Sequence, residues 1–139
     1  MIVIDTSVVI AGIRSPTGAS AKVLEMVVSG RLEAAASTAL GLEYEAVATR
    51  AEHLAAAGLS RAEALIILDA LTAMMKDTPI RWQLRPLSSD PNDDLVLEAA
   101  FNAGAHLIVT NNPRDFERSS PALGIRTIAP HVILSEMER

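Results

Sequence analysis

The chain opens with Met1-Ile2-Val3-Ile4-Asp5-Thr6-Ser7-Val8-Val9-Ile10, and the first part of this stretch decides the fold. Three β-branched residues in a row, with no polar residue among them, are typical of a strand buried on both faces of a parallel sheet. A second run of this kind, His106-Leu107-Ile108-Val109-Thr110, lies near the other end of the chain. The carboxyl ends of parallel strands meet at one edge of a sheet, so we expect Asp5 and Thr110 to lie close together.

The segments around these two strands alternate between helical and extended patterns. Helices are predicted at 6–13, 20–29, 38–50, 60–76, 90–103 and 113–118, with a final one from Pro130 onward. Further strands are predicted at 32–36, at 80–84 before Pro86, and at the sheet edge over 124–128. Two helix starts are marked by a capping box, Ser60-Arg61-Ala62-Glu63, and by the acidic Asp90-Pro91-Asn92-Asp93. This alternation predicts a three-layer α/β/α sandwich around a mainly parallel sheet, in a single domain over residues 1–139.

The composition excludes several classes of function. The chain has no Cys, which excludes zinc–thiolate sites, disulfides and cysteine nucleophiles. One Trp, one Tyr and two Phe are too few for the stacking sheet of an RRM-like RNA reader. The formal charge of −5 argues against a protein that coats nucleic acid by charge alone, but not against an enzyme that approaches phosphates through bound cations. No basic leader precedes the first apolar run, and no run nears the ~20 residues of a membrane span, so we expect a cytoplasmic protein with no membrane partner.

Four acids that are far apart in the sequence are predicted to converge beyond the carboxyl ends of the strands. Asp5 ends the first strand, and Asp115 follows the second one. Asp93 lies in the first turn of a helix whose apolar residues follow at four and seven positions, so its side chain should point inward. Glu43 lies at the edge of the apolar stripe of the 38–50 helix. The pattern therefore predicts one crevice lined by four carboxylates.

Carboxylates that converge in this way repel one another unless a cation neutralises them. With no cysteine in the chain and no histidine placed among the acids, the available ligands are all oxygen atoms. Oxygen ligands suit Mg²⁺ and Mn²⁺. One or two such ions turn water into a nucleophile and stabilise charge on a phosphodiester, so hydrolysis of a phosphodiester is the predicted chemistry.

These same residues resemble the motifs of the PIN-domain family, over essentially the whole chain. Ile2 to Ile10 is similar to the family's apolar strand followed by Asp-Thr-Asn/Ser, and Leu42-Glu43-Tyr44 is similar to its helix-borne Glu-Tyr. Asp90-Pro91-Asn92-Asp93-Asp94-Leu95-Val96-Leu97-Glu98-Ala99-Ala100 resembles its Asp-Pro-Asp-Asp-x-x-Leu-x-x-Ala segment. The last match is Gly104-Ala105-His106-Leu107-Ile108-Val109-Thr110-Asn111-Asn112-Pro113-Arg114-Asp115-Phe116, which resembles its Gly-Ala-x-x-Leu-Val-Thr-x-Asn-x-x-Asp-Phe ending.

The resemblance implies which residues form the site. Its catalytic acids carry over onto Asp5, Glu43, Asp93 and Asp115, of which Asp5, Asp93 and Asp115 are expected to bind the metal. The residues expected to contact or support the substrate are Thr6, Ser7, Thr110 and Asn112. Arg14 and Arg114 lie near the predicted rim by their position in the sequence and are expected to hold RNA phosphates, with solvated loop charge as an equal alternative. Asp90 or Asp94 is an alternative to Asp93. Ser7 stands where many relatives have Asn, which is a mild departure from the pattern.

Within the family, the chain resembles in particular the stand-alone PIN proteins that form the toxin component of bacterial and archaeal toxin–antitoxin pairs, the VapC-like ribonucleases. It implies cleavage of RNA that depends on Mg²⁺ or Mn²⁺. It also implies a homodimer and a cognate antitoxin protein that blocks the site.

Simpler interpretations and rival functions stand beside this one. Asp5 at a strand end is also typical of an ordinary helix N-cap, and the acids from Asp90 to Asp94 also favour a helix terminus. A receiver domain or an aspartyl phosphatase would need a lysine after a central strand, and the only lysines are Lys22 and Lys76. A non-catalytic PIN module, or a nuclease that acts on DNA, would have the same fold. His53, His106 and His131 form no triad and are expected to be structural or surface residues.

Overall fold

The fold is an α/β sandwich with a five-stranded, all-parallel sheet, seen in a computed structural model that describes residues 1–85 and 90–138. The sheet order is β3-β2-β1-β4-β5. The strands are β1 (Ile2–Ile4), β2 (Ala34–Ala36), β3 (Lys76–Asp77), β4 (Leu107–Val109) and β5 (Arg126–Ile128). The helices are α1 (Thr6–Arg14), α2 (Ala19–Val28), α3 (Thr38–Ala48), α4 (Ala51–Ala57), α5 (Arg61–Ala73), α6 (Pro91–Ala103) and α7 (Pro130–Met137), with short 3₁₀ turns η1 (Pro113–Phe116) and η2 (Pro121–Leu123).

The two apolar runs form the centre of the sheet, as predicted. β1 pairs in parallel with β4, with Ile4 opposite Val109, and on its other side β1 pairs with β2. The backbone N–H of Asp5 donates to the carbonyl of Val109 at 2.9 Å, which extends this pairing by one residue. The side chains of β1 are 0–3 % exposed. Burial on both faces explains why this strand carries no polar residue.

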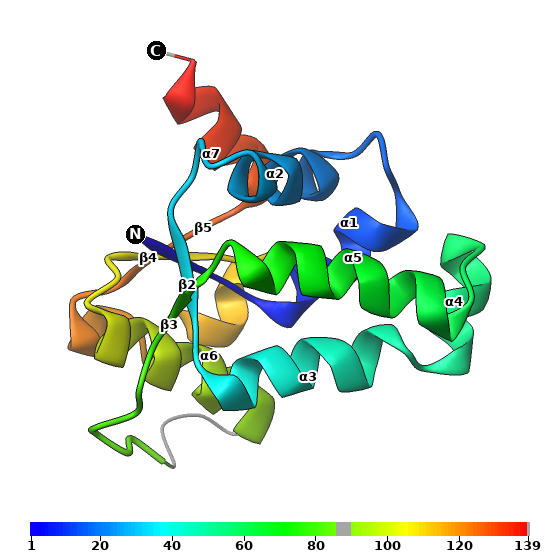
Figure 1. The fold of residues 1–139 in the computed structure, drawn as a ribbon. Coiled ribbons are helices and arrows are strands. Elements are labelled where there is room, and N and C mark those ends of the chain that lie inside the picture. Colours follow the sequence, from blue (N-terminus) through cyan, green and yellow to red (C-terminus); the bar gives the residue numbers. More distant parts are fainter. Residues whose placement is uncertain (86–89, 139) are drawn as a thin grey trace.

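Helices cover both faces of the sheet. α6 packs against β1, β2 and β4 on one face, and α2 and α7, which contact each other, lie on the other side in Figure 1. α1 starts directly at the end of β1 and packs against α2, α3 and α4. α3 contacts both α1 and α6, so it lies beside the carboxyl end of the central strands. The site is therefore bounded by the starts of α1 and α6 and by one side of α3.

Two predictions about local structure were wrong. Residues 80–84 do not form a strand; the third outer strand is β3, Lys76–Asp77, where the 60–76 helix was expected to continue. The backbone N–H groups of Arg81 and Trp82 donate instead to the side-chain oxygen of Asn102 on α6, each at 2.9 Å. A side chain of α6 thus accepts hydrogen bonds from backbone N–H groups that were expected to pair with a neighbouring strand. Pro86, expected to close this segment, lies outside the described residues.

α4 was not predicted, since none of its residues is buried and its sequence has little apolar periodicity. Within the described residues, no helix combines the length and the apolar character that a membrane crossing requires.

Candidate active site

Asp5 occupies the N-cap position of α1, but its side chain does not cap the helix. Its Oδ2 atom accepts hydrogen bonds from the Ser7 hydroxyl and from the Thr110 hydroxyl, both at 2.7 Å. The carboxylate is 7 % exposed, and Thr110 is fully buried. Two hydroxyl donors on one oxygen fix the orientation of the carboxylate, and they leave Oδ1 without a hydrogen-bond donor within the described part of the chain. The ordinary N-cap interpretation does not explain this arrangement.

Asp93 is crowded by other carboxylates. Partial burial at the start of α6 is the first cause, and the charges of Asp90, Asp115, Asp5 and Asp94 follow in that order; together they raise the pKa of Asp93 to about 7. Asp5 follows β1, and Asp93 and Asp115 lie in α6 and η1, so the fold brings their charges together from three separate parts of the sequence. A nearby cation would remove the repulsion that keeps this pKa high.

Glu43 has a different relation to this group. It lies half-buried on α3, one residue before Tyr44, and its charge is not among those that raise the pKa of Asp93. Tyr44 is fully buried and its hydroxyl donates to the carbonyl of Ile4, so α3 is tied to the residue just before Asp5. Burial first, and the charge of Asp5 second, raise the pKa of the Tyr44 hydroxyl above its usual range. Glu43 is thus near the site in the fold, but not within the group formed by Asp5, Asp93 and Asp115.

The acids at the start of α6 fall into different roles. Asp90 is the N-cap, and its Oδ1 accepts from the backbone N–H of Asn92 at 2.9 Å. Asp94 is 3 % exposed, and Glu98, one turn later, is 2 % exposed. Glu98 accepts from Arg85 Nη2 at 3.0 Å and from the backbone N–H of Leu84 at 3.2 Å. Glu98 therefore holds the 81–85 segment against α6, a role that the sequence did not predict.

The residues after β4 support the site through Asn111. Its backbone N–H donates to the Ser7 hydroxyl at 3.2 Å, and its side-chain nitrogen donates to the Ser7 carbonyl at 3.3 Å and to the Ser20 hydroxyl at 3.1 Å. Asn112 was expected to play this part, but its side chain is exposed and only its backbone N–H contacts the network, through Thr110 Oγ1 at 3.0 Å. The Asn111 side chain thus ties the end of β4 to α1 and α2.

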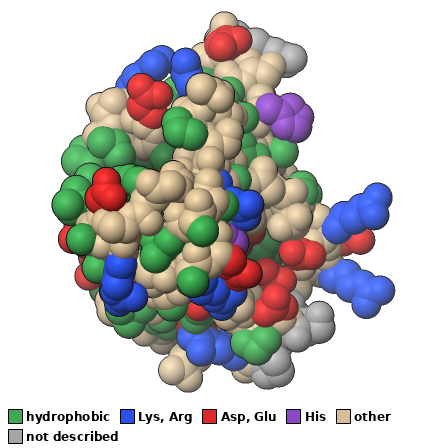
Figure 2. Space-filling model, turned by 90° about the vertical axis from the view of Figure 1, so that its right-hand side faces the viewer, with side chains coloured by type: hydrophobic (Ala, Val, Ile, Leu, Met, Phe, Trp, Pro, Cys, Tyr) green, Lys and Arg blue, Asp and Glu red, His purple; other side chains and the backbone are tan. Residues whose placement is uncertain are grey.

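Basic and acidic side chains share the side of the molecule that carries the strand ends. Figure 2 shows this side, which is at the right of Figure 1, with acidic side chains gathered in one area and Lys and Arg side chains around them. Arg14 and Arg114, both expected to contact substrate, are exposed. Thr6 and Ser7 are half-buried, and with Arg14 they line a cavity beside α1. Exposed cations near an acidic group are suited to holding a polyanion whose phosphate approaches a metal.

The ligand atoms of Asp5, Asp93 and Asp115 suit a divalent cation, although the three carboxylates do not surround a common point. The available ligands are carboxylate oxygens, which Mg²⁺ and Mn²⁺ prefer. Asp5 has one carboxylate oxygen free of hydroxyl donors, and Asp93 and Asp115 remain open to solvent. In residues 1–85 and 90–138, no three Asp, Glu or His side chains lie close enough together to hold an ion as they stand.

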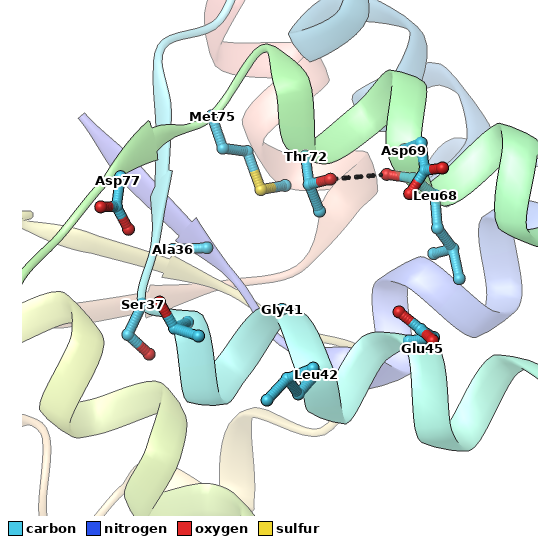
Figure 3. Close-up of a pocket in the computed structure, with 11 residues that line it drawn as sticks. Ala36, Ser37, Gly41, Leu42, Glu45, Leu68, Asp69, Thr72, Met75 and Asp77 are labelled. Carbon is cyan, nitrogen blue, oxygen red and sulfur yellow. Dashed lines mark hydrogen bonds between the residues drawn. The ribbon is translucent and has the colours of Figure 1, made fainter.

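A second, smaller cavity lies on the other side of α3. It has a volume of about 240 Å³ between α3 and α5, with an apolar floor that includes Gly41, Leu68 and Met75. Figure 3 shows Glu45 and Asp69 at one end and Asp77 at the other. These acids belong to the α3–α5 side of the molecule and add nothing to the group around Asp93.

The structure is a parallel α/β sheet with carboxylates gathered beyond its strand ends, where such sheets bind their ligands. The comparison with known families agrees, because the PIN domain family model matches residues 1–114, and the chain belongs to the PIN domain family. The match ends one residue before Asp115, so the place of that acid rests on the structure alone. No curated protein matches the chain.

Proposed function

We propose that this PIN-domain protein is a divalent-metal-dependent endoribonuclease that uses Mg²⁺ or Mn²⁺. The observation that carries the proposal is the gathering of Asp93 with Asp5 and Asp115 beyond the strand ends; burial first, then the charge of Asp90 and those of Asp115 and Asp5, raise the pKa of Asp93 to about 7. Like charges that a fold holds together are typical of a metal-binding catalytic site. Asp5, Asp93 and Asp115 would hold the ion, with Glu43 as a further acid of the site.

The protein's own residues would prepare the reaction. When bound, the divalent ion supplies a water activated for attack and a positive charge for the phosphodiester. Ser7 and Thr110 hold the carboxylate of Asp5 in one orientation, so its other oxygen can face the ion. Arg14 and Arg114 are exposed and can hold the phosphates that flank the cleaved bond. Asn111 ties the end of β4 to Ser7 at the start of α1, which directly follows Asp5.

The biological setting is a further part of the proposal and rests on the family resemblance. We propose a toxin of a toxin–antitoxin pair that acts on RNA in the cytoplasm as a homodimer. A cognate antitoxin protein would block the site. The acidic sequence, with a formal charge of −5, supports an enzyme that meets RNA through its metal and a few arginines.

The test is cleavage of a single-stranded RNA by the pure protein with Mn²⁺, compared with Asp5→Asn and with the control Asp69→Asn. Asp69 is an exposed acid of the α3–α5 cavity. We expect Asp5→Asn to lower the rate by about 10³-fold or more, because several kcal/mol of charge stabilisation are lost. Asp69→Asn should cleave like wild type. Cleavage that persists in EDTA, or that Asp5→Asn leaves undiminished, would reject the proposal.

Two alternatives have their own outcomes in this experiment. A DNA strand of the same sequence that is cleaved faster than the RNA would make DNA the substrate. Binding of RNA without any cleavage, in wild type as in Asp5→Asn, would indicate a non-catalytic PIN module.

A further inference from the structure

A cavity of about 610 Å³ opens directly beside the candidate active site. Most of the lining residues lie on α1, and the others include Val47 of α3, His53 of α4 and Asn111 after β4. The lining residues are Thr6, Ser7, Ile10, Ala11, Arg14, Ser15, Val47, His53 and Asn111. The α1 residues recur at helical spacing, so a single face of α1 looks into the cavity. Its volume lies in the range of sites that hold small organic molecules.

The cavity is joined to the acids through Ser7. The Ser7 hydroxyl donates to Asp5 at 2.7 Å and accepts from the backbone N–H of Asn111, and both Ser7 and Asn111 line the cavity. A ligand group in the cavity is therefore one side chain away from the carboxylate that is proposed to hold the metal. A nucleotide whose phosphate reaches Asp5 would have its base within reach of this space.

The lining of the cavity is less polar than the neighbouring group of Asp5, Asp93 and Asp115, and it carries no negative charge. Ile10, Ala11 and Val47 provide apolar surface, and no Asp or Glu lines the cavity. Two flat, nitrogen-bearing side chains, Arg14 and His53, complete the lining. Unpaired RNA bases typically stack on the planes of His and Arg side chains and bond through their edges. A flat, aromatic, polar-edged ligand suits this combination better than an aliphatic one.

His53 also has an unused polar atom. Its Nδ1 is buried and has no hydrogen-bond partner within the described residues, while its Nε2 lies 3.9 Å from Glu52. Leaving a buried nitrogen without a partner is unfavourable. This atom is shielded from solvent, so it adds nothing to the binding of a ligand in the cavity.

We propose that this cavity receives one unpaired nucleobase of a single-stranded RNA, next to the phosphate that is cleaved. The proposal rests on the proposed nuclease function and narrows its substrate to RNA with an unstacked base at the cleavage point. In a duplex the bases are stacked and paired, so none is free to enter. The cavity would make the protein select single-stranded segments.

The first experiment fills the cavity from α3. Val47 lines it, whereas Leu42 lies on the same helix, is 60 % exposed and lines the α3–α5 cavity. Val47→Trp and the matched control Leu42→Trp are each made in the Asp5→Asn background, and fluorescence anisotropy measures their binding of a labelled single-stranded oligoribonucleotide. We expect Val47→Trp to weaken binding by about tenfold or more, which is the loss of one stacked base. Equal affinities of the two variants would overturn the proposal.

The second experiment alters the ligand and does not depend on whether Val47→Trp folds. One abasic position is moved along the same oligoribonucleotide, and each version is measured against Asp5→Asn. We expect one position to weaken binding by about tenfold and the others to have little effect. A uniform response along the strand, or a fully paired duplex that binds as tightly as the single strand, would overturn the proposal.

Failure of this inference can be separated from failure of the proposed function. Wild-type protein is assayed with Mn²⁺ on bis(p-nitrophenyl) phosphate, a phosphodiester that has no nucleobase. Hydrolysis together with equal binding by Val47→Trp and Leu42→Trp would keep the nuclease and reject the base pocket. Absence of any hydrolysis, of this ester and of RNA, would reject the nuclease function whatever the binding data show.

Discussion

Asp93 and Asp94 are neighbours on α6, yet the structure places them in opposite environments. Asp93 is half-buried among like charges, and its pKa is raised to about 7. Asp94 is 3 % exposed and lies one turn before Glu98, which is 2 % exposed. Glu98 pairs with Arg85 and with the backbone of Leu84. Asp93 on one side of α6, and Asp94 and Glu98 on another, thus have different roles.

The difference teaches how to tell a functional carboxylate from a structural one in this fold. A carboxylate surrounded by donors stabilises the segment that it holds. A carboxylate surrounded by other carboxylates destabilises the metal-free protein, and a cation reverses that effect. On this basis Asp93 has a role in catalysis, and Glu98 has a role in the stability of the fold. Substitution of Asp93 should therefore change activity, and substitution of Glu98 should change stability.

Among the substitutions on α6, the largest effect is expected for Asp93→Asn, and it should fall on activity alone. Loss of one proposed metal ligand should lower the rate of Mn²⁺-dependent RNA cleavage by about 10²-fold or more. The fold should be kept, because the amide removes a charge that the surrounding acids repel. Cleavage rates and urea unfolding curves of the same preparation measure both. A variant that loses stability while retaining its cleavage rate would invert the comparison.

Substitution of Glu98 should lower the stability of the protein. Glu98→Ala removes the acceptor of Leu84 and the partner of Arg85 and leaves a cavity in a buried position. We expect the free energy of unfolding to fall by about 3 kcal/mol, because the Leu84 N–H loses its acceptor and a buried side chain is truncated, whereas the half-exposed Arg85 contributes little. Glu98→Gln keeps an acceptor for the Leu84 N–H and should lose less. Urea unfolding of both variants beside Asp93→Asn measures the contrast, and equal stability of Glu98→Ala and wild type would contradict it.

The part of the fold that sequence predicted well is the part with strong local signals. β1 and β4 are unbroken aliphatic runs, and both formed central strands. The capping box from Ser60 to Glu63 forms with both of its hydrogen bonds, at 3.1 and 3.0 Å. β3 has no such signal, since Lys76 and Asp77 are exposed and form a strand only because β2 lies beside them. Tertiary pairing decided that segment.

The candidate site divides in the same way. The meeting of Asp5 and Thr110 followed from the rule that parallel strands end at one edge, and the structure shows their hydrogen bond. The sequence did not reveal that Asn111, and not Asn112, turns its side chain toward α1, because that choice depends on the backbone after β4. The pairing of Glu98 was also missed. Its signal was the spacing of Asp94, Glu98 and Asn102, each four residues apart on one line of α6.

A smaller effect is expected when a divalent ion is added to the metal-free protein. An ion that binds only the folded state stabilises it by mass action, by about 2.7 kcal/mol at a hundredfold excess over its Kd. Asp93→Asn should lose most of this gain, whereas Asp69→Asn, on the α3–α5 cavity, should keep it. Thermal unfolding with Mn²⁺ and with EDTA measures the difference. Equal gains in both variants would place the ion away from Asp93.

The smallest effect is the pH dependence of the metal-free protein. The pKa of Asp93 is about 7 in the folded state and 3.8 is its ordinary value, so the folded state binds the proton more tightly. The free energy of unfolding should therefore fall as the pH rises from about 4 to about 7, and the whole decrease should be present above pH 7. Solvent screening at this half-exposed position limits the size to about 1 kcal/mol or less. Urea unfolding in EDTA at about pH 5 and about pH 8 measures it, with Asp93→Asn as the reference that removes the contribution of Asp93 and keeps those of the other acids. If wild type and Asp93→Asn change by the same amount between the two pH values, Asp93 is not held among like charges in solution, and the contrast with Glu98 loses its physical basis.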